Sequence, residues 1–195
     1  MSKGRESGMP EADYWDSFFN PSCILSRLDC TGIHGDILEF GCGYGTFTIP
    51  AAKANSGKVI ALDIEPDMVT ATARKAREAG LPNVKAERRD FMESDCGIPA
   101  GTCQYAMLFN ILHIERPVEL LKFSFAALAT GGKVGIIHWR SDIKTPRGPS
   151  PDIRPSAEQC RVWGEQAGLN FVRYESLCCC SWHWGLVMSR PALLA

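Results

Sequence analysis

The sequence predicts an α/β fold, in which helices cover both faces of a doubly wound, mostly parallel sheet. Short apolar runs that suit buried strands recur along the chain, and segments with helical spacing separate them. The first run, residues 37–40, leads directly into a turn with three glycines at alternate positions. The chain has 195 residues with 21 Lys and Arg against 22 Asp and Glu. This length suits one domain with a sizeable core, and the balanced charge gives no reason to expect a nucleic-acid or membrane partner.

The glycine-rich turn is the centre of the predicted site. Residues 36–52 read DILEFGCGYGTFTIPAA, which predicts a strand, a turn with Gly41, Gly43 and Gly45, and a helix that opens at Thr46. Such a turn presents backbone N–H groups to a ligand, and glycine lets that ligand approach closely. A dinucleotide fingerprint would place its third glycine at position 46, where this chain has Thr. Glu39, just before the turn, suits a ligand that carries an ammonium group better than it suits a pyrophosphate.

Acidic and amide side chains follow the next three predicted strands. Residues 58–63 end in Asp63, about 20 residues beyond the turn, where a carboxylate can accept hydrogen bonds from both ribose hydroxyls. Residues 83–91 form the third predicted strand, which ends at Asp90 and Phe91, and residues 103–109 form the fourth, which runs into Asn110. Because ligands of such sheets bind beyond the carboxyl ends of the strands, these side chains are expected around one pocket.

The pattern E-x-G-x-G-x-G at residues 39–45 resembles motif I of the class I S-adenosylmethionine-dependent methyltransferases. The resemblance extends over roughly residues 33–190, and the chain is most similar in type to small-molecule members of the methyltransferase-11 type. It implies a Rossmann-like, three-layer fold whose seven-stranded sheet ends in an antiparallel hairpin. Its motifs are specific for the cofactor and weak for the methyl acceptor.

The resemblance also implies a role for each cofactor-binding residue. Glu39 would meet the amino group of S-adenosylmethionine, Asp63 the ribose, and Asp90 with Phe91 the adenine. The other implied contacts are Phe40 and the glycines Gly41, Gly43 and Gly45, Ile64 and Met68 beside the adenine, and Asn110, Ile111 and Leu112 around the methionine portion. No metal is needed, and the cofactor product would be S-adenosylhomocysteine.

Two histidines are candidates for acid–base chemistry. His113 follows the fourth predicted strand and is the first candidate for a general base, because imidazole changes its charge near neutral pH. His138, in the fifth predicted strand, is the second candidate and a possible substrate contact. Each could equally be a structural hydrogen-bond donor at a strand end.

Two further segments are expected near the acceptor. Tyr14 and Trp15 lie in residues 10–30, which either cap the pocket or form a helix packed on the sheet edge. The proline-rich stretch 140–155 is predicted to face the substrate. Its Arg147 and Arg154 would then meet an anionic acceptor, or else remain solvated on the surface.

The rest of the chain completes the predicted architecture. Residues 1–30 are predicted to be a tail, disordered over residues 1–9, and a cap helix, and residues 31–195 a single cofactor-binding domain. Helices are expected over residues 67–79, 117–129 and 156–167, a fifth strand over 133–139, and the hairpin over 170–177 and 183–188.

The nine cysteines include no two C-x-x-C pairs of the kind that bind zinc. Adjacent cysteines on a strand point to opposite faces, so Cys178, Cys179 and Cys180 are assigned to hairpin packing rather than to an ion site. No apolar run approaches a membrane span, and the first residues lack the apolar core of a secretory signal. A reduced, cytoplasmic protein is therefore expected.

The predicted activity is methyl transfer from S-adenosylmethionine to a small molecule, by a monomer or a homodimer. A protein of the same fold that binds the cofactor without turnover is one alternative. An NAD-dependent oxidoreductase is another, although it would explain Asp63 and not Glu39 or Asp90. A nucleic-acid methyltransferase is disfavoured by the balanced charge and by the absence of an N/D-P-P-Y/F tetrapeptide after the fourth strand.

Overall fold

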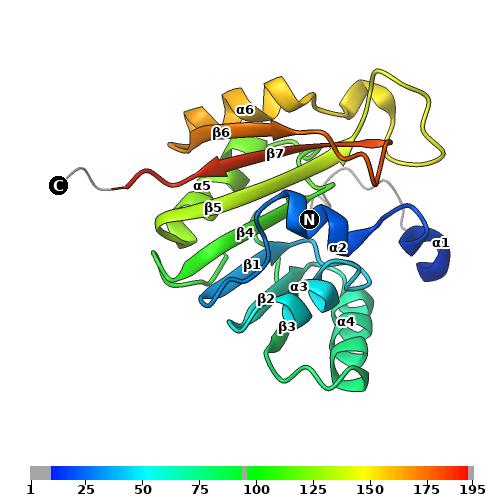
Figure 1. Cartoon of the computed structure of the whole chain (residues 1–195), viewed down its shortest axis with the longest axis vertical. Helices are drawn as coiled ribbons and strands as arrows, with labels where there is room; N and C mark the ends of the chain where they lie inside the picture. The colour runs from blue at the N-terminus through cyan, green and yellow to red at the C-terminus, as the bar shows by residue number, and fades with distance from the viewer. Residues whose placement is uncertain (1–9, 94–95, 193–195) are drawn as a thin grey trace.

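The computed structural model describes residues 10–93 and 96–192, and a seven-stranded sheet runs through its centre (Figure 1). The strand order is β3-β2-β1-β4-β5-β7-β6, with β1 to β5 parallel and β7 antiparallel to both of its neighbours. This confirms the predicted doubly wound sheet with an antiparallel hairpin at its end. The strands are β1 (Asp36–Phe40), β2 (Val59–Asp63), β3 (Val84–Arg88), β4 (Cys103–Phe109), β5 (Leu128–Trp139), β6 (Asn170–Glu175) and β7 (His183–Ser189).

The helices begin where the sequence supplies the appropriate residues. Three of them start at a proline, whose missing N–H is not needed in the first turn. The last helix is capped by Ser156, whose hydroxyl accepts a hydrogen bond from the Gln159 N–H at 3.1 Å. The helices are α1 (Ala12–Asp16), α2 (Pro21–Arg27), α3 (Thr48–Ala54), α4 (Pro66–Glu78), α5 (Pro117–Ala127) and α6 (Ala157–Gln166), with a 3-10 turn η1 (Pro151–Ile153).

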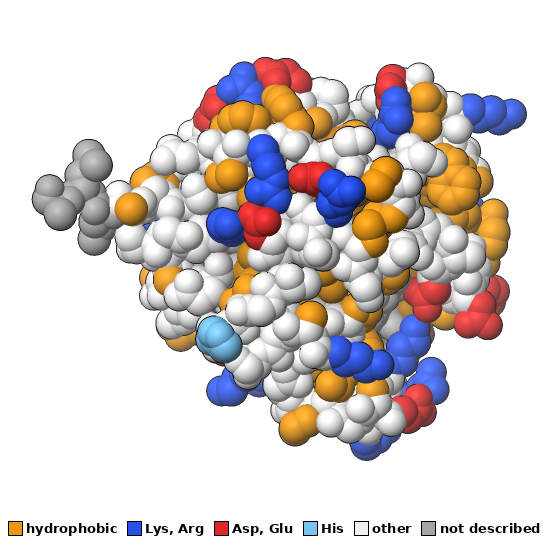
Figure 2. All heavy atoms as spheres, viewed as in Figure 1, with side chains coloured by type: hydrophobic (Ala, Val, Ile, Leu, Met, Phe, Trp, Pro, Cys, Tyr) orange, Lys and Arg blue, Asp and Glu red, His pale blue; other side chains and the backbone are white. Residues whose placement is uncertain are grey.

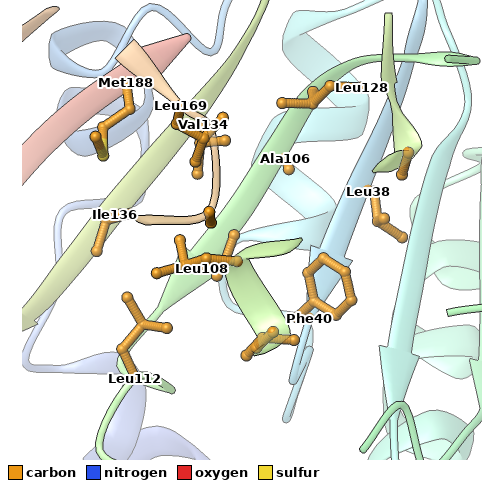
Figure 3. Close-up of a cluster of buried hydrophobic side chains, with 14 of the residues drawn as sticks. Leu38, Phe40, Ala106, Leu108, Leu112, Leu128, Val134, Ile136, Leu169 and Met188 are labelled. Atoms are coloured by element: carbon orange, nitrogen blue, oxygen red, sulfur yellow. The ribbon is translucent and has the colours of Figure 1, made fainter. Parts of the chain in front are cut away.

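The buried side chains form two clusters, one on each face of the sheet. On β4, Ala106 and Leu108 belong to the cluster that also includes residues of α5 and α6. Figure 3 shows these two side chains beside those of β1 and β5 in the same cluster. Tyr105, Met107 and Phe109 belong to the cluster that includes residues of α2 and α3. Successive strand residues therefore face opposite layers, and the fold has the three layers that the sequence predicts.

The segment before β1 is part of this packing. Leu25 and Leu28 are completely buried, and the Tyr105 hydroxyl donates to the Leu28 carbonyl at 2.6 Å. Thus α2 packs on a face of the sheet over the central strand β4, rather than on the sheet edge that one of the two alternatives for residues 10–30 expected. A domain boundary at residue 30 stays a prediction, and the expected tail over residues 1–9 lies outside the described residues.

Three predicted element boundaries are wrong. The third strand ends at Arg88, so Asp90 lies in the loop beyond it. The fifth strand begins at Leu128, within the predicted helix, because Leu128 already pairs with Cys103 of β4. The register then shifts around two glycines that were expected to end the helix. The helix after the glycine turn begins at Thr48 rather than two residues earlier.

The expectation that all cysteines are reduced is also wrong. Cys23 of α2 and Cys179 of the β6–β7 loop form a disulfide, since the fold brings these residues together across 156 positions of sequence. The neighbouring Cys178 is exposed, whereas the Cys180 thiol is buried and donates to the Phe18 carbonyl at 2.9 Å. The three consecutive cysteines therefore have separate surroundings. Within the described ranges, no three His, Cys, Asp or Glu side chains gather as a metal site, and no helix is long and apolar enough to cross a membrane.

Candidate active site

A cavity of about 490 Å³ lies at the carboxyl ends of five neighbouring strands. Its wall contains residues that end or follow β3, β2, β1, β4 and β5, which are adjacent in that order in the sheet. Strands lie about 4.8 Å apart, so this wall extends over roughly 19 Å. The strand order reverses between β1 and β4, and open α/β sheets bind their ligands at such a point.

The glycine turn forms the wall beyond β1. Gly41, Gly43 and Gly45 all have positive φ, at 74°, 52° and 75°. A Cβ on Gly41 would lie 2.7 Å from the Cδ1 atom of Ile111, so a side chain there would require the Ile111 side chain, which also lines the cavity, to move. Gly41 and Gly43 line the cavity, whereas Gly45 lies outside its wall and packs against Thr72. The turn thus exposes bare backbone to the cavity at its first two glycines.

Asp63 ends β2 and holds the turn from the adjacent strand. Its Oδ2 accepts a hydrogen bond from the Gly43 N–H at 2.8 Å, and its Oδ1 accepts one from the Glu65 N–H at 3.0 Å. Burial raises the pKa of the Asp63 carboxyl above its ordinary value, against the effect of these backbone donors. Each carboxylate oxygen carries a second lone pair, so Asp63 can accept two further hydrogen bonds from a vicinal diol in the cavity.

Glu39 places a second carboxyl in the wall, and it is only 2% exposed. The Thr48 hydroxyl donates to its Oε2. Burial raises the pKa of Glu39 to about 8, and the nearby Asp63 charge adds to that rise. A cationic group in the cavity would favour the ionised carboxylate and offset the cost of burying it. The hydrogen-bond acceptors on β1 and β2 therefore fit a ligand with an ammonium group and a ribose.

The loop after β3 supplies an apolar part of the wall. Phe91 is 7% exposed and meets the ring of Phe40 edge to face at 5.2 Å. Asp90 shapes this loop, because its Oδ1 accepts hydrogen bonds from two backbone N–H groups, at 3.1 and 3.2 Å. Ile64 and Met68 also line the cavity. Phe40 itself lies in the core rather than in the wall.

Asn110, directly after β4, is the most unusual residue in the wall. Its φ is 57°, a left-handed conformation, and its backbone N–H donates to the Ile137 carbonyl at 2.9 Å. Both polar atoms of its side-chain amide are buried, and neither has a hydrogen-bond partner among the described residues. Buried amides are almost always paired, so both polar atoms of this one are available to a ligand in the cavity. Ile111 also lines the cavity, whereas Leu112 is buried in the core shown in Figure 3.

His113 and His138 form a buried pair beside the same loop. His113 lines the cavity and is 9% exposed, and its Nδ1 lies 3.2 Å from Nε2 of His138. His138 is completely buried, and burial lowers its pKa to about 3. It lies behind His113 rather than in the wall, because β5 turns its side chain away from the cavity. The structure therefore does not support His138 as a substrate contact.

Four aromatic side chains surround the β5 end of the cavity: Trp15, Phe47, Phe109 and Trp139. The ring centroids of Phe47 and Phe109 are 4.7 Å apart, and those of Trp15 and Trp139 are 6.4 Å apart. Only Trp15 was predicted. Phe109 and Trp139 end their strands, so their positions in the sequence could have assigned them to the cavity wall. Phe47 does not end a strand, and its position gives no such indication. Pro149 completes this part of the wall.

Two predicted acceptor contacts do not line the cavity. Tyr14 is 51% exposed and packs its ring on Phe18, because successive residues of α1 point in different directions. Arg147 is also absent from the wall. Arg154 instead closes the stretch 140–155 on itself, since its guanidinium donates to the carbonyls of Pro149 and Arg140, each at 2.7 Å. The stretch contributes Pro149 to the cavity rather than an arginine.

Residues 37–132 match the sequence family described as "Methyltransferase domain". The chain is 41% identical over 105 residues to nocamycin O-methyltransferase of Saccharothrix syringae, covering 52% of this chain and 36% of that protein. It is 39% identical over 157 residues to ribosomal protein L11 methyltransferase of Vibrio cholerae serotype O1 (strain M66-2), covering 74% of this chain and 48% of that protein. The chain thus spans less than half the length of either relative.

The fold has a clear counterpart among solved structures. A SAM-dependent methyltransferase from Aquifex aeolicus superposes with a TM-score of 0.79 at 21% identity, over 92% of this chain and 94% of that one. At 21% identity this likeness concerns the fold alone. The similarity to methyltransferases in sequence comes from the family match and the two relatives above. Residues 37–132, which contain the glycine turn and the strand-end acids, thus match a methyltransferase domain, and the fold is that of a SAM-dependent methyltransferase.

Proposed function

We propose that this protein transfers the methyl group of S-adenosylmethionine to a small-molecule acceptor. One observation carries the proposal. A single continuous cavity joins the buried carboxyls of Glu39 and Asp63, at one end, to a histidine and an aromatic wall at the other. A cofactor that is cationic and contains a ribose fits the first end, and the second end leaves room for an acceptor.

The polar ends of the cofactor are assigned to three side chains. Glu39 takes the ammonium group, and Asp63 takes the two ribose hydroxyls with the lone pairs that face the cavity. The amide of Asn110 pairs with the methionine portion, which would satisfy its two buried polar atoms. Gly41 and Gly43 let the backbone approach the same portion.

The adenine is assigned to the wall beyond β3. Asp90 and Phe91 hold it, with Ile64 and Met68 packed beside the ring. Ile111 flanks the methionine portion. Three residues predicted from the sequence, Phe40, Gly45 and Leu112, would then support the wall from outside it.

The reaction requires few catalytic groups from the protein. S-adenosylmethionine, when bound, supplies a methyl carbon that its sulfonium already activates. The chain contributes alignment of the acceptor with that carbon and exclusion of water. Trp15 covers the acceptor end, and His113 is proposed to receive a proton where the acceptor has one to lose. This assignment needs no metal ion.

A small acceptor is favoured by the volume of the cavity and by the distribution of charged side chains on the surface. A cavity of about 490 Å³ is in the usual range for small-molecule sites. Acidic and basic side chains are interspersed on the face shown in Figure 2, so that face has no positive patch for a nucleic acid. The relatives' names point to two acceptor classes, a small molecule for one and a ribosomal protein for the other. We propose the former here, in a cytoplasmic monomer or homodimer.

Calorimetric titration with S-adenosylmethionine, S-adenosylhomocysteine and NAD tests this proposal. We expect micromolar binding of the two adenosyl ligands and no heat from NAD. Binding of NAD alone would overturn the proposal. Saturable binding without any S-adenosylhomocysteine formed, across a wide panel of acceptors, would instead identify a cofactor-binding protein without turnover.

A further inference from the structure

We infer that Asp16 is a positioning residue, which holds Trp15 in the cavity wall by tying α1 to the glycine turn and to α4. The tie keeps the cavity closed, so Asp16 controls how fast the cofactor enters and leaves. The inference rests on the proposed function and deepens it, because it assigns the control of cofactor exchange at the same site to an acid that lies outside the wall.

Apolar packing fixes α1 only weakly. The helix has five residues, none of its side chains is buried, and Figure 1 shows it at the periphery of the molecule. A helix this short is not stable by itself, because it has too few hydrogen bonds to offset the entropy of ordering its backbone. The ring of Trp15 nevertheless lines the cavity, with the Trp139 ring centroid 6.4 Å away. Contacts with other elements must therefore hold α1 in place.

Two hydroxyls of the glycine turn donate hydrogen bonds to this segment. Oγ1 of Thr46 donates to Oδ1 of Asp16 at 2.5 Å, and the Tyr44 hydroxyl donates to the Pro10 carbonyl, just before α1, at 3.0 Å. Thr46 is 8% exposed, and hydrogen bonds to a carboxylate are stronger than those between neutral groups. The turn thus has two roles, since its first two glycines face the cavity while Tyr44 and Thr46 hold α1.

Asp16 has a second partner on α4. Nζ of Lys75 lies 3.3 Å from Oδ2 of Asp16, and the two side chains are 28% and 38% exposed. An ion pair this accessible contributes little energy, but it occupies Oδ2 and leaves Oδ1 for Thr46. Asp16 therefore joins three segments that are distant in sequence, namely α1, the glycine turn and α4.

The hydrogen bond between Thr46 and Asp16 lies between the cavity and a second hollow. Thr46 lines both, whereas Asp16 and Lys75 line only the second hollow, whose volume is about 520 Å³. None of the residues of α1 belongs to either buried cluster. When the tie breaks, α1 can therefore move away without disrupting the core, and Trp15 leaves the wall of the cavity.

This arrangement predicts a specific kinetic signature. If the cofactor passes only while α1 is undocked, the fraction of time spent undocked scales both the association and the dissociation rate constants. Loss of the tie raises that fraction in the free and the bound protein alike, so entry and release accelerate together and Kd stays the same. Loss of a residue that merely supported the glycine turn would accelerate release alone and weaken binding.

Surface plasmon resonance of the whole protein with S-adenosylhomocysteine measures both rate constants. Asp16→Ala should raise each on the order of tenfold through loss of a hydrogen bond to a charged group, and Kd should change by less than about twofold. Asp13→Ala is the matched control, because it removes an exposed acid from the same helix with the same change in net charge. Equal changes in both variants, wild-type rates in Asp16→Ala, or faster release with weaker binding would each overturn the inference.

A second matched pair tests the partner of Asp16. Thr46→Val removes the hydroxyl at nearly constant volume and should accelerate exchange as Asp16→Ala does, whereas Thr46→Ser keeps the hydroxyl and should retain the wild-type rates. The double variant Asp16→Ala/Thr46→Val should be no faster than either single variant, because all three lack the same hydrogen bond. Additive effects would show that the two residues act separately and would contradict the tie.

The tie can also be tested without any ligand. The backbone N–H groups of Trp15 and Ser17 donate within α1, to the carbonyls of Glu11 and Asp13 at 2.9 and 3.1 Å. Hydrogen exchange followed by nuclear magnetic resonance should find both amides protected in the wild type and in Asp13→Ala, and about tenfold faster in Asp16→Ala. Unprotected wild-type amides, or equal protection in Asp16→Ala, would overturn the inference. A protected α1 in wild-type protein that binds no S-adenosylhomocysteine would instead contradict the proposed function and reduce Asp16 to a structural contact.

Discussion

The two halves of the cavity are built in different ways. The half assigned to the cofactor consists mainly of residues that end or follow β3, β2, β1 and β4, which are adjacent in that order in the sheet. The half assigned to the acceptor draws on α1, the turn after β1, the ends of β4 and β5, and the stretch 140–155. The first half comes from one repeated structural position, and the second from segments that meet only in the folded protein.

The halves also differ in the interactions that they offer. Two buried carboxyls dominate the first half, and the pKa of each is raised because burial disfavours its charge. Aromatic rings and a histidine pair dominate the second. Charge and hydrogen bonding should therefore decide what the first half binds, while shape and one proton acceptor should decide what the second half accepts.

Asp63→Ala should produce the largest effect and should be confined to the cofactor half. The substitution removes the proposed ribose acceptor and also the acceptor for the Gly43 N–H that holds the turn. We expect cofactor binding to weaken by on the order of 3 kcal/mol, about a hundredfold in Kd. Calorimetric titration measures it, with Asp67→Asn, an exposed acid on the same wall, as the matched control. Equal losses in both variants would contradict the ribose assignment.

Glu39→Gln should change how stability depends on pH. The pKa of Glu39 is about 8 in the fold, against about 4.3 in an unfolded chain. Between these values the folded state holds a proton that the unfolded state has lost, so the contribution of Glu39 to the unfolding free energy falls as pH rises and levels off above about 8. The variant lacks this contribution and should be more stable than the wild type at high pH, by on the order of 2 kcal/mol.

Thermal unfolding without ligand, across a pH range from about 5 to about 9, measures this difference. The raised pKa of Asp63 acts in the same sense in both proteins, so the wild-type curve minus the variant curve isolates Glu39. Parallel curves would mean that Glu39 is already ionised in the fold. The same variant should bind S-adenosylmethionine more weakly, because the proposed partner of the ammonium group is lost.

Trp15→Ala should give the smallest effect, and only in the acceptor half. We expect KM for an acceptor from the panel described above to rise about tenfold through loss of ring contacts, with the Kd for cofactor unchanged. Tyr14→Ala is the matched control, because the adjacent ring is 51% exposed and lies outside the wall. Steady-state kinetics of S-adenosylhomocysteine formation compares the two. A change in cofactor affinity for Trp15→Ala would break the division of the cavity into two halves.

The sequence by itself determined the sheet, the glycine turn and the position of the strand-end acids. Apolar runs and turn glycines are local signals, and parallel strands align their ends at one edge. Gly41, Gly43, Asp63 and Asn110 could therefore be assigned to one pocket from spacing alone. Local signals were weaker at element ends, where β3 stopped before Asp90 and β5 began inside the predicted helix.

Only the tertiary structure decided which side chains line the half of the cavity assigned to the acceptor. It brought Trp139 into the wall and put His138 behind His113, although these two residues are neighbours on one strand. It also turned Tyr14 outward and paired Cys23 with Cys179. The physical reason is that these outcomes depend on contacts between segments far apart in the sequence, which the period of a single strand or helix does not encode.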